Sequence, residues 1–166
     1  MAFDYFLKLE GVDGESTDDK HKDWIEIDSF SWGLGQAVIG EDGLRPAAGG
    51  GGGAGKVQVQ DFSFVKKIDK SSPVLMLSCA TGQHMKEGVL IGRRAGEKPL
   101  EYLKIKLSDI LISGYQTGGS AGDMVPTDQF SLNFAKIEFS YTPQDPRGAE
   151  GKTVTTGYDV KANKKV

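Results

Sequence analysis

The sequence predicts a mainly β protein: a β-barrel of two curved antiparallel sheets with one short α-helix packed on it. Apolar and polar residues alternate along most of the chain, which is the period-two pattern of half-buried strands. Within three stretches the alternation changes parity, and a β-bulge at such a point would bend the strand as a closed sheet requires. The 166 residues suffice for one domain with a real core, so residues 1–166 are expected to form a single domain.

The parity change is clearest in residues 24–32 (WIEIDSFSW). The two isoleucines share one face, while Phe30 and Trp32 share the other, so a bulge is expected near Asp28. The same change occurs in residues 56–64 (KVQVQDFSF) and 130–141 (FSLNFAKIEFSY). The other stretches predicted as strands are residues 2–9, 89–94, 101–107, 109–117 and 154–160.

Residues 72–81 interrupt the alternation and predict the α-helix. Ser72 can cap its N-terminus, Pro73 suits its first position, and Gly82 suits its C-terminal stop. The side chains expected on its buried face are those of Leu75, Met76, Cys79 and Ala80.

The charge balance gives no reason to expect nucleic acid or an anionic membrane as a partner, because 20 basic and 23 acidic residues are interspersed and leave a net charge of -3. No apolar run approaches the length of a membrane span, and the N-terminal residues do not have the pattern of a secretory signal peptide. The protein is therefore expected to start in the cytoplasm, and any export is expected to follow a route that reads no cleaved signal peptide.

A glycine-rich run at residues 49–55 precedes Lys56 and has nearly the spacing of a phosphate-binding loop. Such a loop joins a buried strand to a helix and places a serine or threonine after its lysine. Here strand-like alternation follows the run, and Val57 occupies the hydroxyl position. No nucleotide or other cofactor is expected, and the run is interpreted as part of a long extended loop at about residues 38–55.

The single cysteine and the two histidines do not favour an enzyme or a metal site. Cys79 lies in the middle of the predicted helix beside apolar neighbours, where a thiol is usually inert. His84 follows the helix in a turn, and His21 lies in a polar stretch; two histidines are too few for most zinc sites. The acidic stretch at residues 12–19 lacks the spacing of a calcium loop and is interpreted as a solvated loop.

Six segments in this order resemble the haemolysin-coregulated protein (Hcp) family, the tube subunits of bacterial type VI secretion systems. They are FLKLEGVDGEST, IEIDSFSWG, KVQVQDFSFVKKIDKSSPVLMLSCATGQH, GYQTGGS, SLNFAKIEFSYTPQ and GYDVKANKK, which together extend over almost the whole chain. Tyr158 departs from the family, which often has tryptophan at this position.

The resemblance implies an Hcp-like barrel related to phage tail-tube proteins, and a structural role without enzymatic activity. It implies six-membered rings that stack into a hollow tube, are driven out by a contractile sheath, and carry a VgrG-type spike protein at the tip. It also implies that effector proteins pass through the lumen, which chaperones them, and that the tube protein is itself secreted.

Two sets of residues are candidates for these contacts. Ser29 and Ser31 alternate with the two aromatic residues of DSFSWG, so they are expected on the opposite surface, which the resemblance favours as the lumen. The glycine-rich loop is interpreted as an arm that reaches a neighbouring subunit or ring, because bare backbone can fit closely. Its candidate contact residues are Gly40, Glu41, Asp42, Leu44, Arg45, Gly50 and Gly53.

Three alternatives remain. The nearest is the tail-tube protein of a phage or phage-like contractile particle. Another is a monomeric carbohydrate-binding β-sandwich, against which the aromatic residues argue, because most of them fall at core-parity positions. An enzyme is the third and least favoured.

Overall fold

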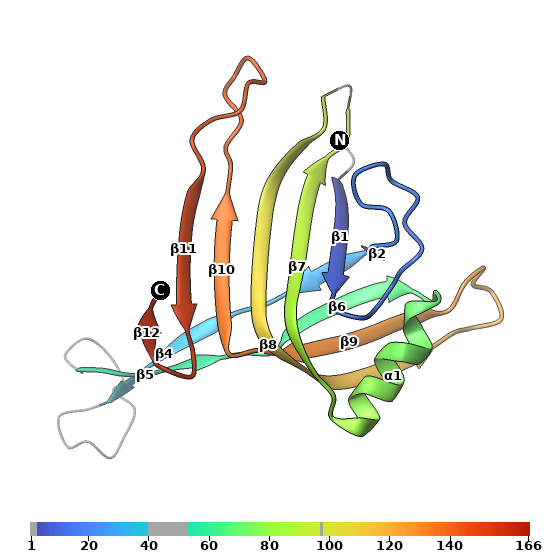
Figure 1. The fold of residues 1–166 in the computed structure, drawn as a ribbon, viewed down its shortest axis with the longest axis horizontal. Helices are drawn as coiled ribbons and strands as arrows, with labels where there is room; N and C mark the ends of the chain where they lie inside the picture. Colours follow the sequence, from blue (N-terminus) through green and yellow to red (C-terminus); the bar gives the residue numbers. More distant parts are fainter. Residues whose placement is uncertain (1–2, 40–52, 97) are drawn as a thin grey trace.

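A computed structural model describes residues 3–39, 53–96 and 98–166, and strands account for most of them (Figure 1). The elements in chain order are β1 (Phe3–Leu9), β2 (Ile25–Ile27), β3 (Ser29–Ser31), β4 (Leu34–Ile39), β5 (Gly53–Val59), β6 (Phe62–Lys67), α1 (Ser71–Thr81), β7 (His84–Arg94), β8 (Leu100–Gly118), β9 (Thr127–Asn133), β10 (Lys136–Tyr141), β11 (Val154–Asp159) and β12 (Lys164–Lys165). The mainly β fold with one helix is confirmed.

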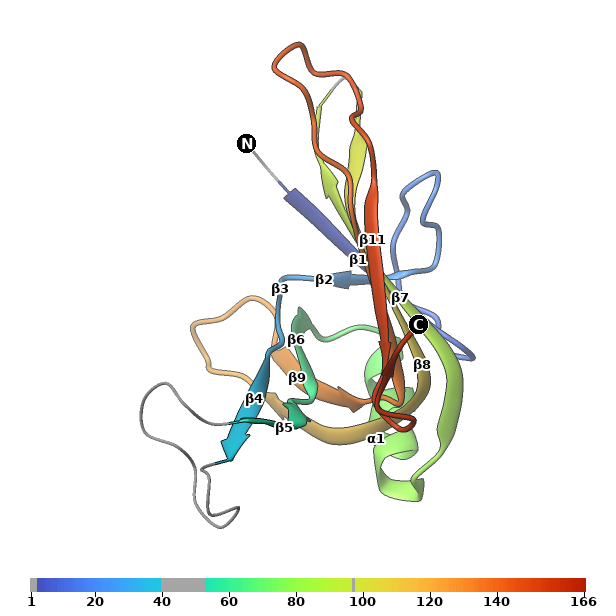
Figure 2. The same cartoon turned by 90° about the vertical axis from the view of Figure 1, so that its left-hand side faces the viewer.

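Two layers of antiparallel strands make up the fold. The tall layer has the order β12-β11-β10-β8-β7-β1-β2, and the short layer consists of β3, β6 and β9. The 19-residue strand β8 joins them, because its first half pairs with β10 and its second half pairs with β9. Figure 2 shows that the short layer bends away from the lower end of the tall layer.

The sheet is open rather than closed into a complete barrel, because its hydrogen-bonded path ends at β12 on one side and at β2 on the other. The bulges expected at the parity changes, however, are wrong. At each of them the strand stops and a new strand begins: β2 gives way to β3, β5 to β6, and β9 to β10. The physical reason is a change of partner, since β2 pairs with β1 whereas β3 pairs with β6.

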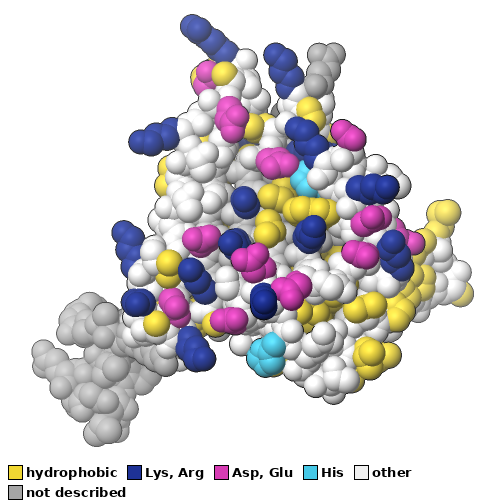
Figure 3. Space-filling model, viewed as in Figure 1, with side chains coloured by type: hydrophobic (Ala, Val, Ile, Leu, Met, Phe, Trp, Pro, Cys, Tyr) yellow, Lys and Arg dark blue, Asp and Glu magenta, His cyan; other side chains and the backbone are white. Residues whose placement is uncertain are grey.

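Apolar side chains of both layers and of α1 form one continuous core. The central members are fully buried and include Leu7, Ile25, Phe62, Phe64, Leu75, Ile105, Leu107, Ile110 and Leu132. Full burial of each such side chain is worth about 1.5–3 kcal/mol. The outward side of the tall layer carries Lys, Arg, Asp and Glu side chains of mixed sign (Figure 3), such as Lys106, which lies 3.1 Å from Glu87.

The helix differs from its prediction at its start and in the face it buries. The helix ends at Gly82, which has the left-handed conformation, as expected. It begins at Ser71, however, and no side chain caps its N-terminus. Ser72 instead lies in the interior, where its hydroxyl donates to Asp128. Met76 and Ala80, expected inside, are exposed. The buried residues of the helix are Ser71, Ser72, Leu75 and Ser78.

Strands β4 and β5 form a separate two-stranded sheet. This hairpin extends from the foot of the molecule at the lower left of Figure 1. Within the described ranges, no helix is both long enough and apolar enough to span a membrane.

Candidate functional site

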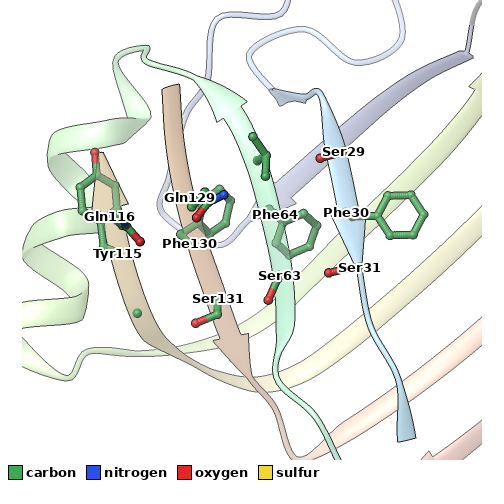
Figure 4. Close-up of a pocket in the computed structure, with 12 residues that line it drawn as sticks. Ser29, Phe30, Ser31, Ser63, Phe64, Tyr115, Gln116, Gln129, Phe130 and Ser131 are labelled. Atoms are coloured by element: carbon green, nitrogen blue, oxygen red, sulfur yellow. The ribbon is translucent and has the colours of Figure 1, made fainter. Parts of the chain in front are cut away.

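The best-defined candidate surface is the exposed side of the short layer, which residues from four strands form in register. Ser31 of β3 is paired with Ser63 of β6, and Ser63 with Ser131 of β9. Ser131 is in turn paired with Gly114 of β8. This row therefore presents three hydroxyl groups and one bare backbone position side by side (Figure 4).

A second row lies two residues further along the same strands. It contains Ser29, Val65, Gln129 and Gln116, again paired in that order from β3 to β8. The serine and both glutamines of this row are exposed. Because side chains two residues apart share a face of a sheet, the two rows form one surface, which we call the polar face.

Aromatic side chains occupy the row between them and point the other way. Phe30, Phe64, Phe130 and Tyr115 are paired across the same four strands. The rings of Phe64 and Phe130 stack with their centroids 5.1 Å apart, and both side chains are buried. Figure 4 shows the side chains of Ser29 and Ser31 pointing away from the ring of Phe30. The strand alternation thus sends the rings into the core and the small polar groups to the surface.

The polar face lines an open hollow of about 430 Å³. Its lining contains serine, glutamine, tyrosine, valine, phenylalanine and glycine, with no carboxylate, imidazole, amine or guanidinium group among the residues that form it. The hydroxyls of Ser113 and Ser131 lie 2.8 Å apart, so neighbouring side chains also bond to one another. Chemically, this surface offers hydrogen-bond donors and acceptors without net charge.

The structure places the two serines expected at the lumen within this surface, and both are exposed. Trp32 packs against Phe62 with centroids 6.0 Å apart, and its indole N–H donates to the carbonyl of Gln60. Sequence reasoning missed the other polar members of the face. The sequence does contain a signal for them. The stretches SFS, FSF and QFSL each place a serine next to a phenylalanine, so that the two side chains point to opposite faces of the sheet.

The loop candidates are mostly outside the described residues. These are Gly40, Glu41, Asp42, Leu44, Arg45 and Gly50. Gly53 lies within the described part, at the start of β5, where it pairs with Ile39 of β4.

The histidine of the polar N-terminal stretch lies between two carboxylates. His21 is buried, and its two ring nitrogens each lie 2.9 Å from a carboxylate oxygen, of Asp18 and of Glu101. Its ring stacks on Phe6 with centroids 4.6 Å apart. Burial alone would raise the pKa of Asp18, but hydrogen bonds from His21 and Arg93 outweigh it and lower that pKa to about 2.

The contacts of His21 with two carboxylates and the ring of Phe6 indicate a structural role for this histidine. Cys79, the residue considered as a nucleophile, is half-buried on α1 and packs against the core. Among the described residues, no group of three or more His, Cys, Asp or Glu side chains is arranged to hold a metal ion. His84 is exposed at the start of β7.

Comparisons with known proteins agree with this fold. The family model described as type VI secretion system effector, Hcp, matches residues 6–141. Protein hcp1 of Pseudomonas aeruginosa is 44% identical over 165 residues, which cover 98% of this chain and 98% of that protein.

Solved structures extend the agreement to three dimensions. Hcp1 of Salmonella typhimurium superposes with a TM-score of 0.79 at 35% identity, covering 100% of both chains. A type six secretion system protein superposes with a TM-score of 0.89 at 31% identity, covering 99% of this chain and 100% of that one. The chain with the polar face described above therefore belongs to the Hcp family of the type VI secretion system.

Proposed function

We propose that this protein is the structural subunit of a secretion tube. Six copies form a ring, rings stack into a hollow tube, and the polar face lines the channel. The observation that carries the proposal is the uncharged surface of serine and glutamine side chains, built in register across four strands. Family membership supplies the type VI secretion context.

An uncharged polar wall suits a channel that passes different proteins. A strongly charged wall would repel cargo of the same sign, and an apolar wall would retain cargo by hydrophobic contact. Hydroxyl and amide groups can exchange hydrogen bonds with cargo and with water at small net cost. Effector proteins would bind this wall weakly enough to leave it, and the ring would chaperone them until export.

The remaining partners follow from the type VI context. A contractile sheath surrounds the tube, a VgrG-type spike caps it, and the subunit leaves the cell with the tube without a cleaved signal peptide. The β4–β5 hairpin and the glycine-rich loop between its strands form the arm that contacts a neighbouring ring, through Gly53 and the loop residues named above.

The first test is the size and shape of the particle. The purified protein should have a mass about six times that of the 17.9 kDa chain, and negative-stain images should show hollow rings. A stable monomer at micromolar concentration would contradict the proposal.

The second test addresses the channel wall. Ser31→Gln enlarges an exposed side chain on the polar face, so rings should form normally while the retention or export of at least one effector falls. Thr17→Gln, at an exposed position outside the polar face, is the matched control. If the Ser31 variant keeps and exports every cognate effector as the control does, the polar face is not the cargo path.

The third test addresses the arm. Shortening the run from Gly49 to Gly53 should leave the two layers folded, because glycines add no side chains to the core. Circular dichroism should be unchanged, whereas ring stacking or ring closure should weaken. Unchanged tube formation would show that the run is only a spacer.

A further inference from the structure

Residues 10–24, which connect β1 to β2, form a segment that we call the N-terminal strap. Figure 2 shows it on the side of the tall layer opposite the short layer. Phe6 of β1 and Ile91 of β7 are paired on this outward side; both are buried, although neither belongs to the main core. The ring of His21, from the strap, lies stacked on Phe6. The strap therefore covers apolar surface on the outside of the sheet.

The two halves of the strap are hydrogen-bonded to each other. The backbone amides of Gly14 and Ser16 donate to the carbonyls of Asp23 and Trp24 at 2.8 and 3.1 Å, and the amide of Asp23 donates to Ser16 at 2.9 Å. These bonds hold the strap in shape, but they do not attach it to the sheet. Attachment to β7 and β8 comes from side chains.

His21 is the centre of this attachment. Its Nδ1 lies 2.9 Å from Asp18 within the strap, and its Nε2 lies 2.9 Å from Glu101 of β8. A carboxylate can only accept hydrogen bonds, and a neutral imidazole has one N–H group and one bare nitrogen. A neutral ring would therefore place two acceptors against each other at one of these contacts.

The geometry thus requires one proton more than a neutral ring and two carboxylates carry. Because an imidazole is intrinsically more basic than a carboxylate, this proton belongs to the ring. The ring of His21 is then a cation that donates one hydrogen bond to the strap and one to the sheet.

The surrounding charges favour that cation. The charged side chains of the cluster are Asp18 of the strap, Asp4 and Lys8 of β1, Arg93 of β7 and Glu101 of β8. The other charged side chains of the strap are exposed. The guanidinium of Arg93 is shared, since it lies 2.8 Å from Asp18 and 3.3 Å from Asp4. A charged His21 therefore supplies a second cation where three carboxylates meet.

We propose that the N-terminal strap is a pH-sensitive device: the doubly protonated ring of His21 fastens it to the tall layer, and loss of one ring proton as the pH rises loosens it. A cation that gains carboxylate partners on folding stabilises the strap only while it is charged, so the effect is present at low pH and is lost as the pH rises. All these groups belong to one chain, so the behaviour of the strap does not depend on the proposed ring.

Asp18 does not cause the change. Burial by itself would raise its pKa, but hydrogen bonds from His21 and Arg93 lower the pKa to about 2, so this group stays a carboxylate throughout the range from pH 5 to 9.

Hydrogen–deuterium exchange between pH 5 and 9, corrected for the intrinsic effect of pH on exchange, measures the attachment. Protection of the amides of Gly14, Ser16 and Asp23 should fall by about tenfold to a hundredfold as the pH rises, the range that loss of one hydrogen bond between charged groups implies. Protection of the central residues of β8 should not change, which provides an internal reference.

Glu101→Gln is the decisive variant, at a position that is 44% exposed and tolerates the change. The new amide can donate to the bare nitrogen of a neutral ring, so the strap should stay protected at both ends of the pH range. His21→Gln should give weak protection throughout. His84→Gln removes the exposed second histidine and is the matched control that should respond as the wild type does.

Equal protection of the wild-type strap at pH 5 and pH 9 would overturn the proposal. The same holds if Glu101→Gln still loosens as the pH rises, or if the response disappears in His84→Gln. Circular dichroism checks the fold of each variant, and if His21→Gln is unfolded, the comparison of Glu101→Gln with the wild type still decides.

Discussion

Replacing Lys66 by methionine should lower the free energy of unfolding by about 3–5 kcal/mol, because it leaves a buried carboxylate without its counter-charge. The ammonium group of Lys66 lies 2.9 Å from Asp128 Oδ2, and both side chains are 0% exposed. It also lies 2.9 Å from Asp69 Oδ1 and donates to the hydroxyl of Ser72. This cluster joins β6, β9 and the start of α1.

The size of the loss follows from the charge state of Asp128. Burial by itself would raise the pKa of this carboxyl group, but hydrogen bonds from Ser72 and Lys66 outweigh burial and hold the pKa below its ordinary value. The group is therefore ionised at neutral pH. Without the lysine it must either remain an unpaired buried charge or take up a proton, and both changes cost free energy of folding.

Denaturant unfolding followed by circular dichroism measures the loss in the free energy of unfolding. In thermal unfolding of a chain of this size, the same loss should lower the midpoint temperature by about 6–20 °C. Lys67→Met is the matched control: this neighbouring lysine is exposed and lies 3.6 Å from Asp28, so its loss should cost about 0–1 kcal/mol. In Lys66→Met/Asp128→Leu both charges are gone, and most of the stability should return. If the double variant is no more stable than Lys66→Met, the unpaired carboxylate is not the cause.

Two further predictions concern the N-terminal loop. Because the folded pKa of Asp18 is about 2, below the value of about 3.9 in an unfolded chain, its stabilising effect is full above about pH 5 and is lost as the pH falls towards 2. Asp18→Asn should therefore weaken the acid dependence of unfolding measured between pH 2 and 6; an unchanged profile would contradict this. A Cβ atom on Gly14 would lie 2.4 Å from the carbonyl oxygen of Trp24, so Gly14→Ala should cost at least about 1–3 kcal/mol, whereas Gly35→Ala, which meets nothing within 4 Å, should cost less than 1 kcal/mol in the same assay.

The strands could be predicted because each buries one side, and period-two alternation records that burial directly. Whether the sheet closes could not be predicted, because a change of parity indicates that the chain turns but not which strand it pairs with next. At Asp28 and at Gln60 the turn is a break between strands that pair with different neighbours.

The helix shows a different limit of sequence reasoning. Its apolar residues were expected inside, but the buried ion pair beneath α1 needs hydroxyl groups, and Ser72 supplies one. The signal was present in β6, where Lys66 has the same parity as Phe62 and Phe64 and therefore had to be buried. A lysine at a core position implies a buried acidic partner, but the sequence does not say which of the chain's acidic residues it is.

The candidate site was predictable in part for the same reason. The alternation of DSFSWG placed Ser29 and Ser31 opposite the aromatic rings, which is where they lie, whereas the partners of these serines depend on the pairing of β3 with β6 and of β6 with β9. Register is a long-range property, so one strand cannot reveal it.

Because serine and phenylalanine alternate in these strands, the order of the polar face depends on the packing of the core. A one-residue slip of β6 against β9 would move Phe64 to the surface and Ser63 into the core, so the stacked rings fix the register that aligns the hydroxyl groups. The aromatic row thus gives the polar face its order, while the serines themselves contribute little to the core. Substitutions on the polar face can therefore change what the surface binds without changing the register, whereas truncating Phe64 would disturb the core and the polar face together.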